Sequence, residues 1–402
     1  MNGGMFSWSA CKSLFIVLLL EYLKMNECED LETSAPQALV FGGNGFMGIP
    51  TVEKLLIGGY HVTIVNRGNW YWDSDVRIKP RVSHVTCDRY KSLSHCKNME
   101  ALHNFKFDVV IDFSAYERFQ VQDVFKIFQD RIGLYILISS DSVYEVCNKS
   151  YDGYSREIDA VRPRNVLQRE EYAKKDNYGH RKLLCEEELQ FQNMKWGVPF
   201  LSLRLPDVIG PRDNTYRWWI YQLQIRLHAH LSNEVRIPKS VCHQPLSLVH
   251  SDDVADLIVH ICSQSPEKFA HGKAYNLAFK ENPTLFELLE AIKSELNMRD
   301  VPIICAAESM PELYPTVTLG PVDTSSAEQE LSWNPTTLSE AVKDNVNFYE
   351  SAARNPEFKK ELASALDFTK SSMPMTDGYG DKLYKAFNKE YRTMDSTMKD
   401  EL

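Results

Sequence analysis

The chain has 402 residues, of which 44% are hydrophobic, and its formal net charge at pH 7 is −10. This length suits one large α/β unit with an appended lobe, and the apolar fraction is enough for a substantial core. Because no basic surplus is available to neutralise phosphates, the charge disfavours non-specific binding of nucleic acid.

Residues 1–30 are interpreted as a signal peptide. Lys12 precedes an apolar run over residues 14–20, which has the length of the hydrophobic core of such a peptide. The run is shorter than the roughly 20 residues that cross a bilayer, so no membrane span is predicted. A cytosolic or disordered N-terminal extension is the alternative.

The first predicted strand, residues 38–42, leads into a glycine cluster that is followed by an amphipathic helix at 49–57. Such a turn presents backbone N–H groups and the positive end of a helix dipole to a pyrophosphate. Glycine suits positions where the chain turns with positive φ, approaches a phosphate, or packs a helix against a strand. The candidate cofactor-binding residues are therefore Gly42, Gly45, Phe46, Met47 and Gly48. A βαβ turn without a ligand is the alternative.

Strands and helices alternate through the rest of the first half. Alternation with short loops predicts an α/β fold with a doubly wound parallel sheet of Rossmann type, covered by helices on both faces. Residues 38–205 are accordingly expected to form an NAD(P)-binding domain. The remaining predicted strands are 61–65, 82–86, 108–113, 134–139 and 199–203, and the remaining predicted helices are 99–104, 119–130 and 178–194.

Three side chains form the candidate catalytic group. Ser140 follows a predicted strand, at the edge where open α/β sheets bind ligands. Tyr178 and Lys182 lie one helical turn apart and project from one face. A tyrosine titrates at about 10, too high for a base at neutral pH, but a neighbouring ammonium favours the phenolate. Tyr178 is therefore expected to exchange a proton with the substrate, and Ser140 to bind its reacting oxygen.

Beyond residue 205 the pattern changes. A strand at 246–249 and helices at 252–263 and 284–296 predict a smaller substrate lobe, residues 206–350, interleaved with the sheet. Its aromatic residues suit either the lobe's core or an apolar pocket; they include Trp218, Trp219 and Tyr221. Residues 351–402 are rich in charge and predict an exposed helical or disordered tail.

The last four residues, 399–402, are Lys-Asp-Glu-Leu, the sequence by which a receptor returns soluble proteins to the endoplasmic reticulum. This signal acts only on a protein that has entered the lumen, so it and the predicted signal peptide support each other. Together they predict a location in the endoplasmic reticulum lumen, with the KDEL receptor as a partner.

The nine cysteines include no Cys-x-x-Cys pair, and no metal site is predicted. Most are expected to be buried free thiols, although an oxidising lumen permits pairing. Asn148 begins the one acceptable N-glycosylation sequence, because the candidates at Asn282 and Asn334 carry proline in the middle position.

These residues together resemble the NAD-dependent epimerase/dehydratase group of the extended short-chain dehydrogenase/reductase superfamily, which acts on nucleotide sugars. The resemblance runs from about Ala38 to Tyr349. Besides the glycine motif, Tyr178 and Lys182, it rests on Ser139–Tyr144, Arg204 with Gly210–Arg212, His250–Ala255, Tyr275–Leu277 and Leu331–Pro335.

The resemblance implies roles for further residues and implies a cofactor and substrate. The cofactor would be NAD or NADP, the small-molecule substrate a nucleotide sugar, and the protein a homodimer. Positions that contact the dinucleotide in relatives are Asp88, Ser114 and Ala115. Positions that contact the substrate are Asp141, Ser142, Asp207 and Arg212.

Three features depart from the family pattern. The second strand ends in Asn66 and Arg67 rather than in the acidic residue that binds the ribose of NAD, so both are assigned to the cofactor and NADP is an option. Asp207 replaces an asparagine, and Leu246 replaces an arginine. The sequence around Asn66 also resembles an atypical branch that includes chloroplast stem-loop RNA-binding proteins, where the same fold has another function.

The leading expectation is therefore a luminal NAD(P)-dependent epimerase, dehydratase or oxidoreductase that acts on a nucleotide sugar. One alternative is a hydroxysteroid-type or small-ketone reductase, with Trp218, Trp219 and Tyr221 lining an apolar pocket. Another is a non-catalytic dinucleotide-binding scaffold or an RNA-binding relative. The acidic charge and the luminal signals disfavour RNA as a partner.

Overall fold

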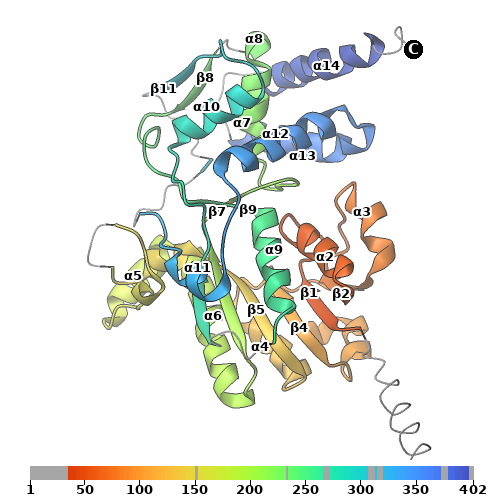
Figure 1. Cartoon of the computed structure of the whole chain (residues 1–402), viewed down its shortest axis with the longest axis vertical. Coiled ribbons are helices and arrows are strands. Elements are labelled where there is room, and N and C mark those ends of the chain that lie inside the picture. Colours follow the sequence, from red (N-terminus) through yellow and green to blue (C-terminus); the bar gives the residue numbers. More distant parts are fainter. Residues whose placement is uncertain are drawn as a thin grey trace, which may run out of the picture. The chain divides into compact units, whose positions relative to one another are not determined.

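The computed structural model describes residues 35–149, 153–231, 234–265, 272–306, 313–314, 320–372 and 379–397 (Figure 1). The chain divides into residues 1–36 and residues 37–402, and every labelled element belongs to the second unit. The predicted signal peptide (1–30), Ser150 of the glycosylation sequence and the final Lys-Asp-Glu-Leu lie outside the described residues. In the described part of the chain, no helix combines the length and apolarity that a membrane crossing requires.

A seven-stranded sheet forms the centre of the cofactor-binding half, and all of its strand pairs are parallel. One edge strand of the sheet, β10, comes from beyond residue 270 and pairs with β6. This architecture confirms the predicted Rossmann-type fold class. In spatial order the strands are β10 (Lys273–Asn276), β6 (Phe200–Leu205), β5 (Ile132–Ser140), β4 (Phe107–Asp112), β1 (Gln37–Phe41), β2 (His61–Asn66) and β3 (Ser83–Thr86).

Alternate side chains of the strands fill two separate cores, one on each face of the sheet. Val40 of β1 points to the face covered by α2 (Gly48–Ile57) and α9 (Ser251–Cys262), whereas Leu39 points to the face covered by α4 (Arg118–Phe128) and α6 (Asn177–Trp196). Figure 1 shows α2 and α9 side by side on the first face. Because both faces are buried, the strands are nearly continuous apolar runs, which is why they could be predicted.

The connections around the sheet are short helices. The helix predicted at 99–104 is instead the 3₁₀ helix η3 (Lys97–Leu102), whose buried residues, Met99 and Leu102, are spaced by three as 3₁₀ geometry favours. The other connecting elements are α3 (Ser74–Arg77), η1 (Lys79–Arg81), η2 (Leu93–His95), η4 (Asp141–Val146), η5 (Glu157–Asp159), α5 (Val166–Lys175) and α11 (Ser325–Leu331).

A third core belongs to the C-terminal lobe. Trp218, Trp219 and Tyr221 are almost fully buried in it, so the apolar-pocket interpretation of these aromatics is wrong. They are packed by lobe helices and do not reach the cleft described below. The lobe elements are β7 (Asp207–Ile209) paired with β9 (Leu248–His250), β8 (Val235–Pro238) paired with β11 (Ile303–Ala306), α7 (Arg217–Arg226), α8 (His228–Leu231), α10 (Leu285–Glu295) and α12 (Leu338–Arg354).

Residues beyond 350 differ from the exposed tail that their composition predicts. They form η7 (Pro356–Phe358), α13 (Lys359–Ser372) and α14 (Tyr379–Thr397), and Figure 1 shows the two helices beside α12. Leu366 of α13 and Phe387 of α14 are buried in the lobe core. Spaced apolar residues on both helices, diluted by charge in the average composition, provide the buried face.

Four of the described cysteines form two disulfides, Cys87–Cys96 and Cys242–Cys305. The expectation of mostly free thiols is wrong for the described cysteines, since the fold brings partners 9 and 63 residues apart together. His243 lies near the second pair, forming the one potential metal-binding group among the described residues, but the disulfide uses both sulfurs. The remaining cysteines are Cys147, Cys185 and Cys262, which are free, and Cys11 and Cys28, which lie outside the described residues.

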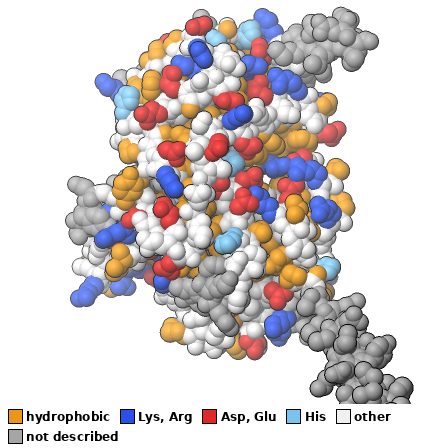
Figure 2. Space-filling model, in the orientation of Figure 1, with side chains coloured by type: hydrophobic (Ala, Val, Ile, Leu, Met, Phe, Trp, Pro, Cys, Tyr) orange, Lys and Arg blue, Asp and Glu red, His pale blue; other side chains and the backbone are white. Residues whose placement is uncertain are grey.

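Charges on the surface are mixed. On the face shown in Figure 2, acidic and basic side chains are interspersed, and the coloured atoms form no continuous basic patch. This distribution agrees with the acidic net charge in disfavouring a nucleic-acid surface on that face.

The packing of α14 generates a first prediction. Phe387→Ala should lower the free energy of unfolding by about 3–5 kcal/mol, because it leaves a cavity in the lobe core. Tyr384→Ala on the same helix, where the side chain is 47% exposed, should change it by less than about 0.5 kcal/mol. Urea unfolding of both variants measures the difference, and equal values would contradict the packing of the C-terminal helices.

Candidate active site

A cleft of about 1100 Å³ lies at the carboxyl ends of the sheet strands, where open α/β sheets bind ligands. Of the residues predicted to bind cofactor or substrate, Ala115 alone does not line it: its side chain is fully buried, and only its carbonyl faces the site. The cleft brings together Gly42, Gly45, Phe46, Met47, Gly48, Asn66, Arg67, Asp88, Ser114, Ser140, Asp141, Ser142, Tyr178, Lys182, Asp207 and Arg212.

The glycine turn is shaped for close approach of a ligand. Gly42 has φ of +80° and donates its N–H to the carbonyl of Val65 on β2, at 3.1 Å. A side chain at Gly48 would overlap the carbonyl oxygen of Gly42, so α2 can begin there only with glycine. No side chain caps the N-terminus of α2 and its first turn holds no acidic residue, which leaves its N–H groups and dipole for an anion. These features fit a pyrophosphate.

Lys182 is held at the centre of the site. Its side chain is buried, and Nζ donates to the carbonyl of Ile138 at 2.8 Å and to that of Ala115 at 2.9 Å. These bonds join α6 to the ends of β5 and β4. Burial lowers the pKa of Lys182 to about 8, so the group is mainly an ammonium at neutral pH. One of its three N–H donors remains for a ligand.

Tyr178 lies one turn before Lys182, whose Nζ is 5.9 Å from the centre of the Tyr178 ring. The side chain is 46% exposed, because it borders the open cleft, and its ring centre is 6.2 Å from that of Tyr116. Desolvation of the hydroxyl raises the pKa of Tyr178, Tyr116 adds to the rise, and a hydrogen bond with Ser140 opposes it. At neutral pH Tyr178 is therefore a phenol and a proton donor.

Asp141 is a second acid beside this group. Ser140 Oγ donates to Asp141 Oδ1 at 3.3 Å and accepts the N–H of Ser142 at 3.2 Å. The other oxygen of Asp141, Oδ2, is buried without a hydrogen-bond partner among the described residues. Burial, followed by the charge of Asp207, raises the pKa of Asp141 to about 8. Asp141 therefore holds a proton at neutral pH.

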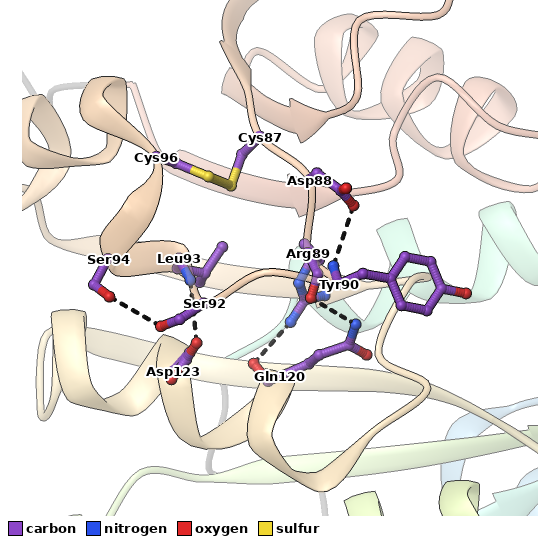
Figure 3. Close-up of a disulfide and its surroundings, with 10 residues drawn as sticks. All are labelled: Cys87, Asp88, Arg89, Tyr90, Ser92, Leu93, Ser94, Cys96, Gln120 and Asp123. Atoms are coloured by element: carbon purple, nitrogen blue, oxygen red, sulfur yellow. Dashed lines mark hydrogen bonds between the residues drawn. A yellow bond between two sulfur atoms is a disulfide. The ribbon is translucent and has the colours of Figure 1, made fainter.

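A buried ion pair, which the sequence did not predict, supports the floor of the cleft. Arg89 Nη1 lies 2.5 Å from Asp112 Oδ1, and Tyr135 donates its hydroxyl to the other oxygen at 2.5 Å. Arg89 also donates to the carbonyl of Gln120, while the Gln120 amide donates to the carbonyl of Arg89 (Figure 3). An acidic residue ending the apolar strand β4 is the signal that could have indicated this pair, since a buried charge requires a partner.

One end of the cleft is shaped by the loop after β3. Asp88, Arg89 and Tyr90 follow Cys87 directly, and the disulfide to Cys96 closes this loop (Figure 3). At the neighbouring end of β2, Asn66 accepts the N–H of Gly68 at 2.6 Å, and Arg67 is exposed at the edge of the cleft. An arginine here is suited to a ribose 2′-phosphate.

Near β7, two arginines that line the cleft form ion pairs with aspartates. Arg212 forms a two-pronged pair with Asp73: Nη2 donates to Oδ2 at 2.6 Å, and Nε donates to Oδ1 at 3.2 Å. Arg217 pairs with Asp207. These pairs fix the loop between β7 and α7 against the cleft.

The protonated state of Asp141 generates a second prediction. A carboxyl with a folded-state pKa of about 8 and an unfolded value of about 4 binds more protons in the folded state, so stability falls as pH rises between these values. Asp141→Asn removes this loss. Its free energy of unfolding, relative to wild type, should rise across that interval.

Urea unfolding at several pH values measures this change, with Asp300→Asn at an exposed position as the control. Parallel profiles for wild type and Asp141→Asn would show that the Asp141 carboxyl is ionised in the folded protein.

Comparisons with known proteins agree with the fold. The chain is similar to the UDP-glucose 4-epimerase of Thermotoga maritima solved with UDP-glucose (18% identity, TM-score 0.59, 78% of this chain and 99% of that chain). It is also similar to the dTDP-glucose 4,6-dehydratase of Bacillus anthracis in complex with NAD (15%, 0.60, 81% and 100%). A third similar structure is the UDP-glucuronic acid 4-epimerase of Bacillus cereus in complex with NAD (17%, 0.58, 78% and 99%).

No curated protein sequence matches the chain. The sequence profile of the NAD dependent epimerase/dehydratase family matches residues 38–278, which is more than half of the chain and includes the glycine turn, Ser140, Tyr178 and Lys182. The protein is therefore a member of the NAD dependent epimerase/dehydratase family.

Proposed function

We propose that the protein is an NAD(P)-dependent enzyme that acts on a nucleotide sugar by epimerisation, dehydration or oxidation. The observation that carries the proposal is the convergence of Ser140, Tyr178 and Lys182 on the cleft that also contains the glycine turn. Three similar structures are nucleotide-sugar epimerases or dehydratases by name, which supports this substrate class.

The residues of the cleft fit a dinucleotide. The uncapped N-terminus of α2 would hold the pyrophosphate, Asp88 and Arg67 would border the adenosine, and the free N–H of Lys182 would bind a ribose hydroxyl. When bound, the nicotinamide accepts a hydride from the substrate and can return it. Two of the similar structures contain NAD, whereas Arg67 suits the additional phosphate of NADP. Binding of each dinucleotide to the purified protein distinguishes them.

The protein's own groups move the proton. Ser140 Oγ would donate a hydrogen bond to the reacting oxygen of the substrate, and the Tyr178 hydroxyl would give a proton to that oxygen or take one from it. Because desolvation raises the pKa of Tyr178, removal of its proton requires nearby positive charge. Lys182 supplies part of that charge while it carries a proton, which is the case below about pH 8.

Asp141 offers a second proton donor within the same cleft. Its raised pKa keeps it protonated at neutral pH, and its Oδ2 has no partner among the described residues. A protonated carboxyl beside the reacting oxygen suits the loss of a hydroxyl group as water. This observation favours dehydration among the reactions that the proposal includes.

A location in the endoplasmic reticulum lumen is part of the proposal. Three observations support it: the final Lys-Asp-Glu-Leu sequence, the exposed Asn148 of the glycosylation sequence, and two disulfides, which are typical of oxidising compartments. The partner that this sequence implies is the KDEL receptor.

The catalytic assignment generates a third prediction. Tyr178→Phe removes the proton-transferring hydroxyl and should lower turnover about a hundredfold or more, while binding of the dinucleotide stays unchanged. Tyr90→Phe, which changes a cleft-lining tyrosine at the adenine end, should retain activity. Assays with a panel of UDP- and dTDP-sugars measure turnover. Full activity of Tyr178→Phe would reject the assignment.

The location generates a fourth prediction. Deletion of residues 399–402 should direct the protein into the culture medium of animal cells, because retrieval requires the C-terminal sequence. Asn148→Gln should remove a shift in mass caused by endoglycosidase treatment. Intracellular retention of the shortened chain, without any glycan, would contradict a luminal location.

A further inference from the structure

The segment after β2, residues 69–73, crosses from the glycine turn to the C-terminal lobe; we refer to it as the bridge. Near its start, the Asn44 side-chain amide of the glycine turn donates to the carbonyl of Asn69. The ring of Trp70 contacts His84 of β3 edge-on, at 5.2 Å between centres. Tyr71 packs against both the sheet core and the lobe core. The bridge therefore contacts both halves of the molecule.

Asp73 fastens the far end of the bridge. Its carboxylate forms the two-pronged pair with Arg212 described above, across 139 residues of sequence. Only 8% of the Asp73 side chain and 10% of the Arg212 side chain is exposed. A two-pronged pair shielded from water is held far more firmly than an exposed surface pair. Asp73 does not need Arg212 as its partner, because it also forms an ion pair with Arg77, which lies one helical turn later.

The C-terminal helices hold the lobe side of this contact. Phe358, immediately before α13, lies 6.4 Å from the Tyr71 ring and 6.1 Å from the Trp72 ring, between centres. Phe358 is itself buried against Trp219 in the lobe core, at 5.0 Å. Phe358 lies beyond the segment matched by the family profile, which ends at residue 278.

The bridge and its partners border the same cleft as the glycine turn. Asn69, Trp70 and Tyr71 line it, together with Arg212 and residues 360, 361 and 364 of α13. A ligand that lies along the glycine turn is therefore enclosed between that turn, the bridge and α13. Release of such a ligand is easier when the contact between bridge and lobe opens.

We propose that Asp73 and Arg212 form a clasp that keeps the dinucleotide in the cleft between turnovers. The proposal rests on the proposed function in one respect, namely that a dinucleotide occupies the cleft. Asp73 and Phe358 are positioning residues in this account, because they act through the bridge. The clasp makes the dinucleotide a resident group, which suits a reaction that returns it to its starting state in each cycle.

The test is the rate at which the full-length protein releases NADH or NADPH, followed by the loss of nucleotide fluorescence when excess oxidised dinucleotide is added. Asp73→Asn removes the charge that holds Arg212 and should accelerate release about tenfold or more. Arg77→Gln is the matched control: it removes the ion pairs of Arg77 with Asp73 and with Glu53, but leaves the pair of Asp73 with Arg212 in place. Its release rate should equal that of wild type.

Thermal unfolding of each variant distinguishes an effect on dinucleotide release from a general loss of stability. A lower melting temperature of Asp73→Asn with an unchanged release rate overturns the clasp. If Asp73→Asn does not fold, Arg212→Lys keeps the charge without the two-pronged geometry and should also release faster than wild type. If the wild-type protein binds neither NADH nor NADPH, both the proposed function and the clasp are contradicted. If the wild-type protein binds the dinucleotide and Asp73→Asn releases it at the wild-type rate, only the clasp is contradicted.

Discussion

The arrangement of the site depends on one buried ammonium. Lys182 donates to the carbonyls of Ile138 and Ala115, so a single side chain fixes the distance between α6 and the ends of β4 and β5. That contact sets Tyr178, one turn away, at the edge of the cleft, near Ser140 at the end of β5. Burial of the Lys182 ammonium is unfavourable and lowers its pKa, and the hydrogen bonds to the two carbonyls partly offset this loss of hydration.

The surroundings of the site determine which of its groups carry a proton at neutral pH. Burial keeps Asp141 protonated, and desolvation of its hydroxyl keeps Tyr178 protonated. The ion pair of Arg89 with Asp112 keeps opposite charges together beneath the cleft. As a result, Asp141 and Tyr178 are proton donors beside the buried ammonium of Lys182 at neutral pH. Such a set of groups can give a proton at once, but can take one only after positive charge has been added.

Much of this could be predicted from local sequence. The glycine turn, the alternating strands and the Tyr178–Lys182 spacing each depend on neighbours a few residues away, and the structure places them together in one cleft. The contacts of Arg89 with Asp112 and of Asp73 with Arg212 join residues 23 and 139 positions apart, and no local pattern predicts such partners. The packing of the C-terminal helices against the lobe was missed for the same reason, since their apolar face has meaning only against Trp219 and its neighbours.

In the proposed mechanism, Tyr178 becomes a base only beside a bound dinucleotide. Near-ultraviolet titration of tyrosinate, taken as wild type minus Tyr178→Phe, measures its pKa with and without oxidised dinucleotide. We expect a raised pKa of Tyr178 in the free protein and a clear fall on binding, because a bound oxidised nicotinamide would add positive charge to the site. An identical pKa in both states, at saturating dinucleotide, would contradict it.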